Sequence, residues 1–540
     1  MTAATAPARP APPRARRVTP AAGPVRLLRI ELRRSPMLWL LPLLAVLFYV
    51  STYRPAMGNP PFWNIRSAMV QSHTMLVFAP LLAGAGAWTG SRDGRRGMGD
   101  LVGVTAVPRW AGQFATWAAA TIWAELLYLG GVGVLYGVTA QQGAWGGPPW
   151  WPVAVGVAVV AASCALGFAA GVRLPGRFTA GLAALVVFLA LAGGAFAIQD
   201  NQVYGQIWPL NVQGPFPPDS YGIFYPYLPD LAIAQLMFLA GLAAAALGAL
   251  GLPAAAGGRW LRGAAAAVTV AGLAAAGTAT GLAGTARVEA HGMVIPALHD
   301  AASDRPARYT PVCRPGTVPV CLQPAYRSFM PEVNAALGPL LGQLAGLPVA
   351  PVRVTQVAVT TVQSTPGNGI NFGGPVIRGR PAVLYLPLAG VSLPGEGHTS
   401  AAQFAWFLRD QYAQEIVNEL VGLPAGAVAI GLNQVGNPGH AAQFAVARAL
   451  DQVLNLTGPP PPNDSSAPGP AGGDNAGSAP TGRSGRAGPG GTASDASSSP
   501  GQMQDAVDRF AAMSVAARHA WLGTHLAALR AGRIALSEIP

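Results

Sequence analysis

The sequence contains no lysine, so its 34 basic residues are all arginine. A phosphate-binding P-loop needs a lysine to hold the β- and γ-phosphates of a nucleotide. An enzyme that works through a Schiff base needs a lysine amine as its nucleophile. The absence of lysine therefore excludes both kinds of site, and this chain cannot bind ATP through a P-loop.

Charged residues are scarce, at 10% of the chain, yet the net charge is +12. A basic balance of this kind can indicate nucleic-acid binding. Many of the arginines, however, fall near the N-terminus and in short loops beside apolar runs, which is typical of loops that face anionic lipid. We therefore expect a lipid bilayer, and no nucleic acid, as the partner of this charge.

Cysteine is also rare, with three residues. Cys164 lies inside an apolar run, where a thiol packs as a small apolar side chain. Cys313 and Cys321 lie in a polar segment and are either two unrelated thiols or, as we favour, a local disulfide, which needs an oxidising compartment. No further ligands accompany them at the spacing of a zinc site, so we expect no metal.

Long apolar runs are what the chain has in abundance. Seven runs lie between residues 37 and 285, at about 37–53, 73–90, 113–139, 151–172, 178–198, 231–252 and 263–285. Each is close to the ~20 residues that cross a ~30 Å hydrocarbon core as a helix. The sequence therefore predicts an α-helical polytopic membrane protein with about seven spans over residues 24–285.

Arginine is distributed unevenly over the loops between these runs. The segment 91–110 carries Arg92, Arg95, Arg96 and Arg109. The segment 200–230 carries no basic residue, although Arg54 and Arg66 lie in the expected outside loop 54–72. The positive-inside rule then predicts a multi-pass protein of the plasma membrane with a cytoplasmic N-terminus. Everything after about residue 286 would lie outside, which agrees independently with a disulfide there.

The N-terminal segment divides into two parts. Residues 1–23 are rich in Pro, Ala and Arg and are expected to be a disordered cytoplasmic tail rather than a secretory signal. Over residues 25–34, Val25, Leu28 and Leu32 share one helical face and three arginines share another. This pattern is typical of a helix in the membrane interface, and an ordinary basic flank to the first span is the alternative.

Glu125 is the exception to spans that are nearly free of charge. A carboxylate in lipid is costly unless it faces a partner or a water-filled cavity. Glu125 is therefore either protonated and hydrogen-bonded between helices or part of a translocation path, and the sequence favours neither. Small-residue spacings at Gly86–Gly90, Gly133–Gly137 and Gly277–Gly281 favour close packing of helices.

The loop between the second and third runs ends in LVGVTAVPRW, after a basic run. With the expected interfacial helix before the first span, residues 24–260 resemble the membrane subunit of a type-2 ABC exporter. In that family, a short helix in this loop docks into a groove of the ATP-hydrolysing subunit. The resemblance implies that the coupling residues are Arg92, Arg95, Arg96, Asp100, Thr105 and Arg109. The chain departs from the family in its count of about seven spans instead of six and in a looser Gly97–Gly99.

The resemblance implies a permease subunit of an ATP-driven exporter, not an enzyme, paired with a second copy or a sister permease. ATP and Mg²⁺ would bind the separate ABC ATPase subunits, and no cofactor is expected on this chain. The alternative is a membrane-anchored extracytoplasmic protein without transport activity, either a binding module or a degenerate peptidase-like fold.

The pattern of residues 286–456 predicts an extracytoplasmic α+β domain. Its expected helices are 331–344, 401–421 and 441–456, and its expected strands are 352–359 and 382–388. Some permeases of this type resemble fusions with zinc aminopeptidases, which need two histidines in an HExxH helix. The segment 401–421 offers Glu415 and Glu419 but no histidine, and His398 and His440 lie outside it, so we expect no hydrolase.

The composition changes twice more before the end of the chain. Residues 457–500 are rich in Pro, Gly and Ser and predict a disordered, flexible linker. Residues 501–540 predict one amphipathic helix, which would pack on the preceding domain, on the membrane face or on a partner.

Overall fold

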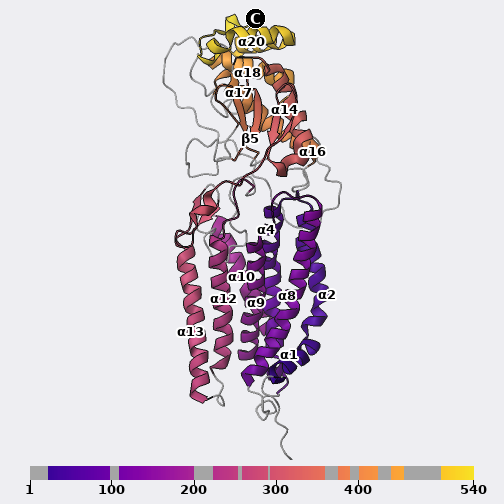
Figure 1. Ribbon diagram of the computed structural model, residues 1–540, viewed down its shortest axis with the longest axis vertical. Coiled ribbons are helices and arrows are strands. Elements are labelled where there is room, and N and C mark those ends of the chain that lie inside the picture. The colour runs from indigo at the N-terminus through magenta and orange to yellow at the C-terminus, as the bar shows by residue number, and fades with distance from the viewer. Residues whose placement is uncertain are drawn as a thin grey trace, which may run out of the picture.

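The computed structural model contains a bundle of long helices and, above it, a mixed C-terminal region (Figure 1). The structure describes residues 22–97, 109–199, 223–252, 258–289, 292–348, 350–358, 375–388, 400–423, 440–454, 456 and 500–540. Residues 1–21 of the expected tail 1–23 and residues 457–499 of the expected linker 457–500 lie outside the described residues, as do Asp100, Thr105 and His398. Residues 22 and 23 belong to the helix α1, and Pro500 begins the helix α19.

All seven predicted apolar runs form helices. After α1 (Ala22–Arg34) come α2 (Met37–Phe48) with α3 (Arg54–Met57), α4 (Trp63–His73) with α5 (Ala79–Gly90), α8 (Arg109–Gln141), α9 (Trp150–Arg173), α10 (Thr179–Gln199), α12 (Asp230–Gly251) and α13 (Gly258–Ala283). Within the described part of the chain, six helices are long and apolar enough to cross a membrane, and Thr179–Ala192 is a shorter apolar helix. The outer surface of the bundle is correspondingly apolar, with Trp39, Leu126 and Val270 strongly exposed.

The prediction that residues 54–72 form a loop is wrong, because most of these residues are helical. The π-helical turn η1 (Tyr49–Tyr53) joins α2 to α3, and η2 (Thr74–Phe78) joins α4 to α5, so the second long helix begins at Trp63. Hydropathy missed α4 because its sequence, WNIRSAMVQSH, is largely polar. Its polar groups are nevertheless buried between helices, where side-chain hydrogen bonds satisfy several of them.

Glycine lets two pairs of helices approach until their backbones touch. On α5, a Cβ on Gly86 would lie 2.7 Å from the carbonyl oxygen of Cys164 on α9, and a Cβ on Gly167 of α9 would overlap the carbonyl of Ala83. Gly241 and Gly272 join α12 to α13 in the same way. Close approach of this kind increases van der Waals contact where lipid offers little hydrophobic driving force.

Only one of the three predicted glycine spacings makes such a contact. Gly86 and Gly90 pack against α9 as expected. Among the described residues, nothing lies within 4 Å of a Cβ on Gly133, Gly137, Gly277 or Gly281. These two spacings therefore make no helix contact within that part of the chain, because the pattern does not determine which face of a helix turns inward.

The C-terminal region is built on a five-stranded sheet in the order β3-β4-β5-β7-β6. Its strands are β3 (Val312–Arg314), β4 (Val320–Leu322), β5 (Arg353–Gln356), β6 (Val376–Arg378) and β7 (Val383–Leu386). The strands β4, β5 and β7 are parallel, and β3 and β6 pair antiparallel at the edges. A two-stranded hairpin of β1 (Arg287–Glu289) and β2 (Gly292–Val294) connects the region to α13.

Helices and sheet share one apolar core. The helices are α14 (Met330–Leu344), α16 (Ala401–Phe407), α17 (Gln414–Val421), α18 (Ala441–Leu454), α19 (Pro500–Ala512) and α20 (Val515–Arg530). The predicted helices 331–344, 401–421 and 441–456 and strands 352–359 and 382–388 are present, with the middle of 401–421 in a π-helical turn, η7 (Leu408–Ala413). Leu337, Leu384 and Val446 are among the fully buried side chains of this apolar core.

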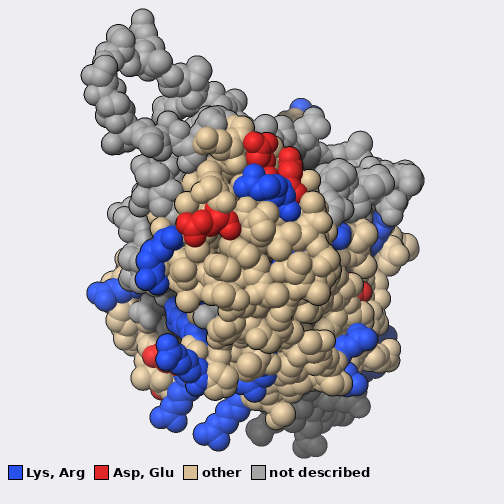
Figure 2. All heavy atoms as spheres, turned by 90° about the horizontal axis from the view of Figure 1, so that it is seen from above, with Lys and Arg blue, Asp and Glu red and all other residues tan. Residues whose placement is uncertain are grey.

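The last segment forms two helices, so the single helix predicted over 501–540 is wrong. The side chain of Ser514 caps the N-terminus of α20 by accepting a hydrogen bond from the amide of Ala517, and this cap separates α19 from α20. Phe510 and Leu526 bury both helices in the core of the C-terminal region. Seen from above, that region carries its charged groups towards the margins and has a largely uncharged middle (Figure 2).

Candidate functional site

The predicted coupling segment leaves the bundle at the end where α1 lies (Figure 1). The short helix α6 (Arg92–Arg95) follows α5. The guanidinium of Arg92 lies 3.6 Å from the carboxylate of Glu31 on α1 and also contacts Asp93. Arg92 therefore links α1 to the start of the segment, and its guanidinium is paired with carboxylates of its own chain.

Arg95 is also held by its own chain. Its guanidinium stacks over the ring of Trp88, 3.6 Å from the ring centroid, and its Nη2 donates a hydrogen bond to the carbonyl of Trp88, 3.1 Å away. The neighbouring Gly94 lies against Pro175, in the turn between α9 and α10. The α6 segment is thus fixed to α5 on one side and to the α9–α10 turn on the other.

Arg96 and Arg109 differ from these two arginines because both side chains are exposed. Arg96 follows α6, and Arg109 is the first residue of α8. Of the six residues predicted to couple, the structure therefore divides the four that it describes into an inward pair and an outward pair. Sequence reasoning missed this division because it depends on Glu31 and Pro175, which are distant in the chain, and on the folding of Arg95 back over Trp88.

Glu125 lies in the bundle interior, on the face of α8 that also carries Thr121 and Tyr128. Among the described residues, neither carboxylate oxygen of Glu125 has a hydrogen-bond partner, although both atoms are buried. The hydroxyl of Thr121, one turn away, is likewise buried and unpaired in the described part of the chain. The first of the two alternatives for Glu125, a hydrogen bond between helices, is therefore not formed within these residues.

A buried polar network near the other end of the bundle was missed by sequence reasoning. The guanidinium of Arg66 on α4 donates hydrogen bonds to Thr139 Oγ1 on α8, at 2.9 Å, and to the carbonyl of Asn59, at 3.0 Å. Gln71 Nε2 donates to Gln235 Oε1 on α12, at 3.0 Å. These bonds connect three helices. In the sequence, the polar residues Arg66 and Gln71 close to an apolar run were the only signal that could have indicated them.

An aspartate–histidine–aspartate chain joins the bundle to the C-terminal region. Asp230, at the start of α12, accepts hydrogen bonds from the amide of Ile295 at 2.9 Å and from His299 Nδ1 at 3.1 Å. His299 Nε2 lies 3.0 Å from Asp304 Oδ1. Burial alone lowers the pKa of His299, but the hydrogen bonds and charges of Asp304 and Asp230 outweigh it and raise the pKa above its ordinary value.

The predicted disulfide between Cys313 and Cys321 is present and joins paired residues of β3 and β4. Cys164 is a buried free thiol, as predicted. Among the described residues, no group of His, Cys, Asp and Glu side chains could hold a metal ion.

On α17, Gln414 and Asn418 stand at the spacing of the two histidines of HExxH, and neither side chain is a usual zinc ligand. The nearby Glu419 carboxyl is half-buried, which raises its pKa against the opposing effect of Arg530 and Arg378. His440 lies just before α18 and hydrogen-bonds to Gln443 in the first turn of that helix.

These features define a mostly helical protein with several helices that could cross a membrane and a small mixed sheet. In comparisons with protein-family models, curated proteins and solved structures, nothing matches the chain. The function is therefore argued from the residues alone.

Proposed function

We propose that this chain is the membrane-spanning permease subunit of an ATP-driven exporter, coupled to a separate ATPase subunit through residues 91–110. The observation that carries the proposal is the division of the arginines at the α1 end. Arg92 and Arg95 tie the segment to the bundle, while Arg96 and Arg109 remain exposed. A segment that is fixed on one side and cationic on the other is suited to transmit the movement of a docked partner.

The orientation that we propose places the α1 end in the cytoplasm. Arginines at the ends of helices gather there, namely Arg92, Arg95, Arg96, Arg109, Arg173, Arg259 and Arg262. The disulfide lies in the C-terminal region, beyond the opposite end of the bundle (Figure 1). A basic cytoplasmic side and a disulfide on the oxidising side are both expected for this orientation.

The contacts suggest how movement would spread from the coupling segment. A shift of α6 would act on α5 through Trp88 and on the α9–α10 turn through Pro175. The close glycine contacts between α5 and α9 would make these two helices move as one body. Alternating access would then consist of movement of this body relative to α12 and α13, which are joined by their own glycine contacts.

A second candidate function is a membrane-anchored extracytoplasmic protein in which the helices only anchor. The size of the apolar core in the C-terminal region favours it, because that core is large enough for an independent role. Gln414 and Asn418 stand at the spacing of the two histidines of HExxH. Side chains that are not usual zinc ligands at this spacing would fit a degenerate peptidase-like fold or a binding module rather than an active hydrolase.

The two functions can be separated by purifying the tagged full-length chain in mild detergent from its own cells. The exporter proposal expects a stoichiometric ABC ATPase that is lost in the Arg96→Glu/Arg109→Glu variant. Arg33→Glu/Arg34→Glu is a matched control, because these exposed arginines lie at the same end of the bundle on α1. Purification without an ATPase, before and after crosslinking of the wild type, would refute the exporter proposal.

A further inference from the structure

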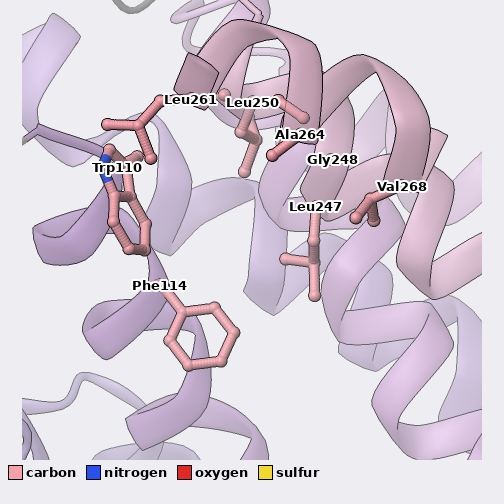
Figure 3. A pocket seen from close by; sticks show the side chains of 10 residues that line it. Trp110, Phe114, Leu247, Gly248, Leu250, Leu261, Ala264 and Val268 are labelled. Carbon is pink, nitrogen blue, oxygen red and sulfur yellow. The ribbon is translucent and has the colours of Figure 1, made fainter. Parts of the chain in front are cut away.

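An apolar pocket of about 270 Å³ opens between α8 and the α12–α13 pair. Trp110 and Phe114 of α8 form one wall, and Leu247, Leu250, Leu261 and Val268 contribute to the other (Figure 3). The pocket lies where α8 and α13 begin and α12 ends, which is the α1 end of the bundle. Its contents are therefore expected to be apolar and to enter at the level of a membrane interface.

Arginines on three helices lie beside residues that line this pocket. Arg109 directly precedes the lining residue Trp110, and Arg262 directly follows Leu261. Arg173 of α9 donates a hydrogen bond to the carbonyl of Ala249, between the lining residues Gly248 and Leu250. An apolar pocket thus has three arginines next to its lining residues or bonded between them.

We propose that this pocket binds one anionic phospholipid, with part of an acyl chain between α8 and the α12–α13 pair and the phosphate among Arg109, Arg173 and Arg262. Charge complementarity identifies the headgroup, because basic pockets between membrane helices attract anionic lipid headgroups. The apolar walls identify the tail, since burial of methylene groups drives binding of the acyl chain.

The position of Trp110 supports a lipid rather than a free anion. Tryptophan is enriched at the level of lipid headgroups, where the ring meets the acyl chains and the ring N–H meets the polar layer. A water-soluble phosphate would contact the arginines but would leave the pocket below them unfilled. A bound lipid would instead contact both α8 and α13. Without the lipid, α12 is the helix that connects these two.

Native mass spectrometry of the full-length protein tests the proposal. The protein in detergent is titrated with palmitoyl-oleoyl phosphatidylglycerol and, separately, with phosphatidylcholine carrying the same acyl chains. We expect one phosphatidylglycerol to bind about 150-fold more tightly, which corresponds to the usual contribution of three arginines near an anionic membrane surface. Soluble glycerophosphoglycerol should not displace it.

Two variants and two matched controls locate the site. Arg173→Gln/Arg262→Gln should reduce the preference for phosphatidylglycerol about 30-fold, to the roughly fivefold preference that Arg109 alone supplies. Arg33→Gln/Arg34→Gln removes the same charge and should leave the preference unchanged. Arg109 is left intact, so loss of lipid binding is distinguishable from loss of the proposed ATPase coupling.

Ala264→Phe, which fills the pocket, should weaken binding of both lipids, and Ala267→Phe on the exposed side of α13 should not. Equal binding of the two lipids by the wild type, or equal losses in variants and controls, would overturn the proposal. Displacement by soluble glycerophosphoglycerol would also overturn it and would identify a site for a free anion. If the arginine variant does not fold, the Ala264→Phe and Ala267→Phe pair still decides the result.

Discussion

Arg66 Nη1 lies 2.9 Å from Thr139 Oγ1, so a fully buried arginine of α4 is hydrogen-bonded to α8 inside the helical bundle. Thr139 in turn donates to the carbonyl of Leu135, one helical turn earlier, at 2.7 Å. The threonine hydroxyl is therefore directed as an acceptor towards the guanidinium. This pair accounts for a polar segment within a helix that is otherwise apolar.

Removal of either side chain of this pair should destabilise the bundle. We expect Arg66→Ala and Thr139→Val each to cost about 1–3 kcal/mol, the penalty for leaving a buried polar group unpaired. In the double variant the two costs should not add, because both changes remove the same bond. Thermal unfolding in detergent measures all three variants, and fully additive losses would contradict a direct interaction.

Substitution of the contacting glycines should have effects opposite to those at the exposed ones. Gly167→Ala would place a methyl group onto the carbonyl of Ala83, and we expect a loss of about 1–3 kcal/mol from overpacking. Gly133→Ala meets open space and should gain up to about 1 kcal/mol from helix propensity. The melting temperatures of the two variants should therefore move in opposite directions, and a decrease for both would indicate that Gly133 contacts a partner.

The hydrogen bonds of His299 to Asp230 and Asp304 should weaken as the pH rises above 6.5. Because the pKa of His299 is raised in the folded protein, its stabilisation is complete below the ordinary pKa of 6.5 and is lost as pH rises through the folded-state value. The melting temperature of the wild type should fall over this range, and His299→Gln should remove that part of the decrease. If the decrease is unchanged in the variant, another group causes it.

The disulfide provides a test of both orientation and stability. In intact cells, a membrane-impermeant maleimide should label the exposed Cys313 only after reduction, and the buried Cys321 and Cys164 should not react. Labelling that requires permeabilised cells would contradict the proposed orientation. Cys313→Ser/Cys321→Ser should abolish labelling and lower stability by about 2.5 kcal/mol, the chain-entropy contribution of so short a loop.

Replacement of Glu125 by leucine should stabilise the purified protein. Its buried carboxylate oxygens have no hydrogen-bond partner among the described residues, so their removal should recover about 1–3 kcal/mol of desolvation penalty. Glu31→Leu is the control, because it breaks the contact with Arg92 and should not stabilise. A decrease in melting temperature for Glu125→Leu would instead indicate a partner, such as an ion or a second copy, as in a translocation path.

Part of the candidate site was predictable from the sequence and part was not. The arginines of segment 91–110 are visible as a charge pattern, as is the single carboxylate at Glu125. The roles of the arginines differ, however, because Trp88 and Glu31 engage Arg95 and Arg92 while Arg96 stays exposed. The aspartate–histidine–aspartate chain at His299 had no signal in the sequence, because Asp230 lies 69 residues before His299.

The sequence by itself determined the apolar helices of the bundle and favoured the Cys313–Cys321 disulfide. Both are local properties: an apolar run must satisfy its own backbone as helix, and the cysteines are close along the chain. The tertiary structure decided the rest. It buried the polar helix α4, selected Gly86 and Gly167 as contacts over Gly133, and divided the C-terminal helix at Ser514. Such choices depend on which faces of distant helices meet, and no local pattern carries that information.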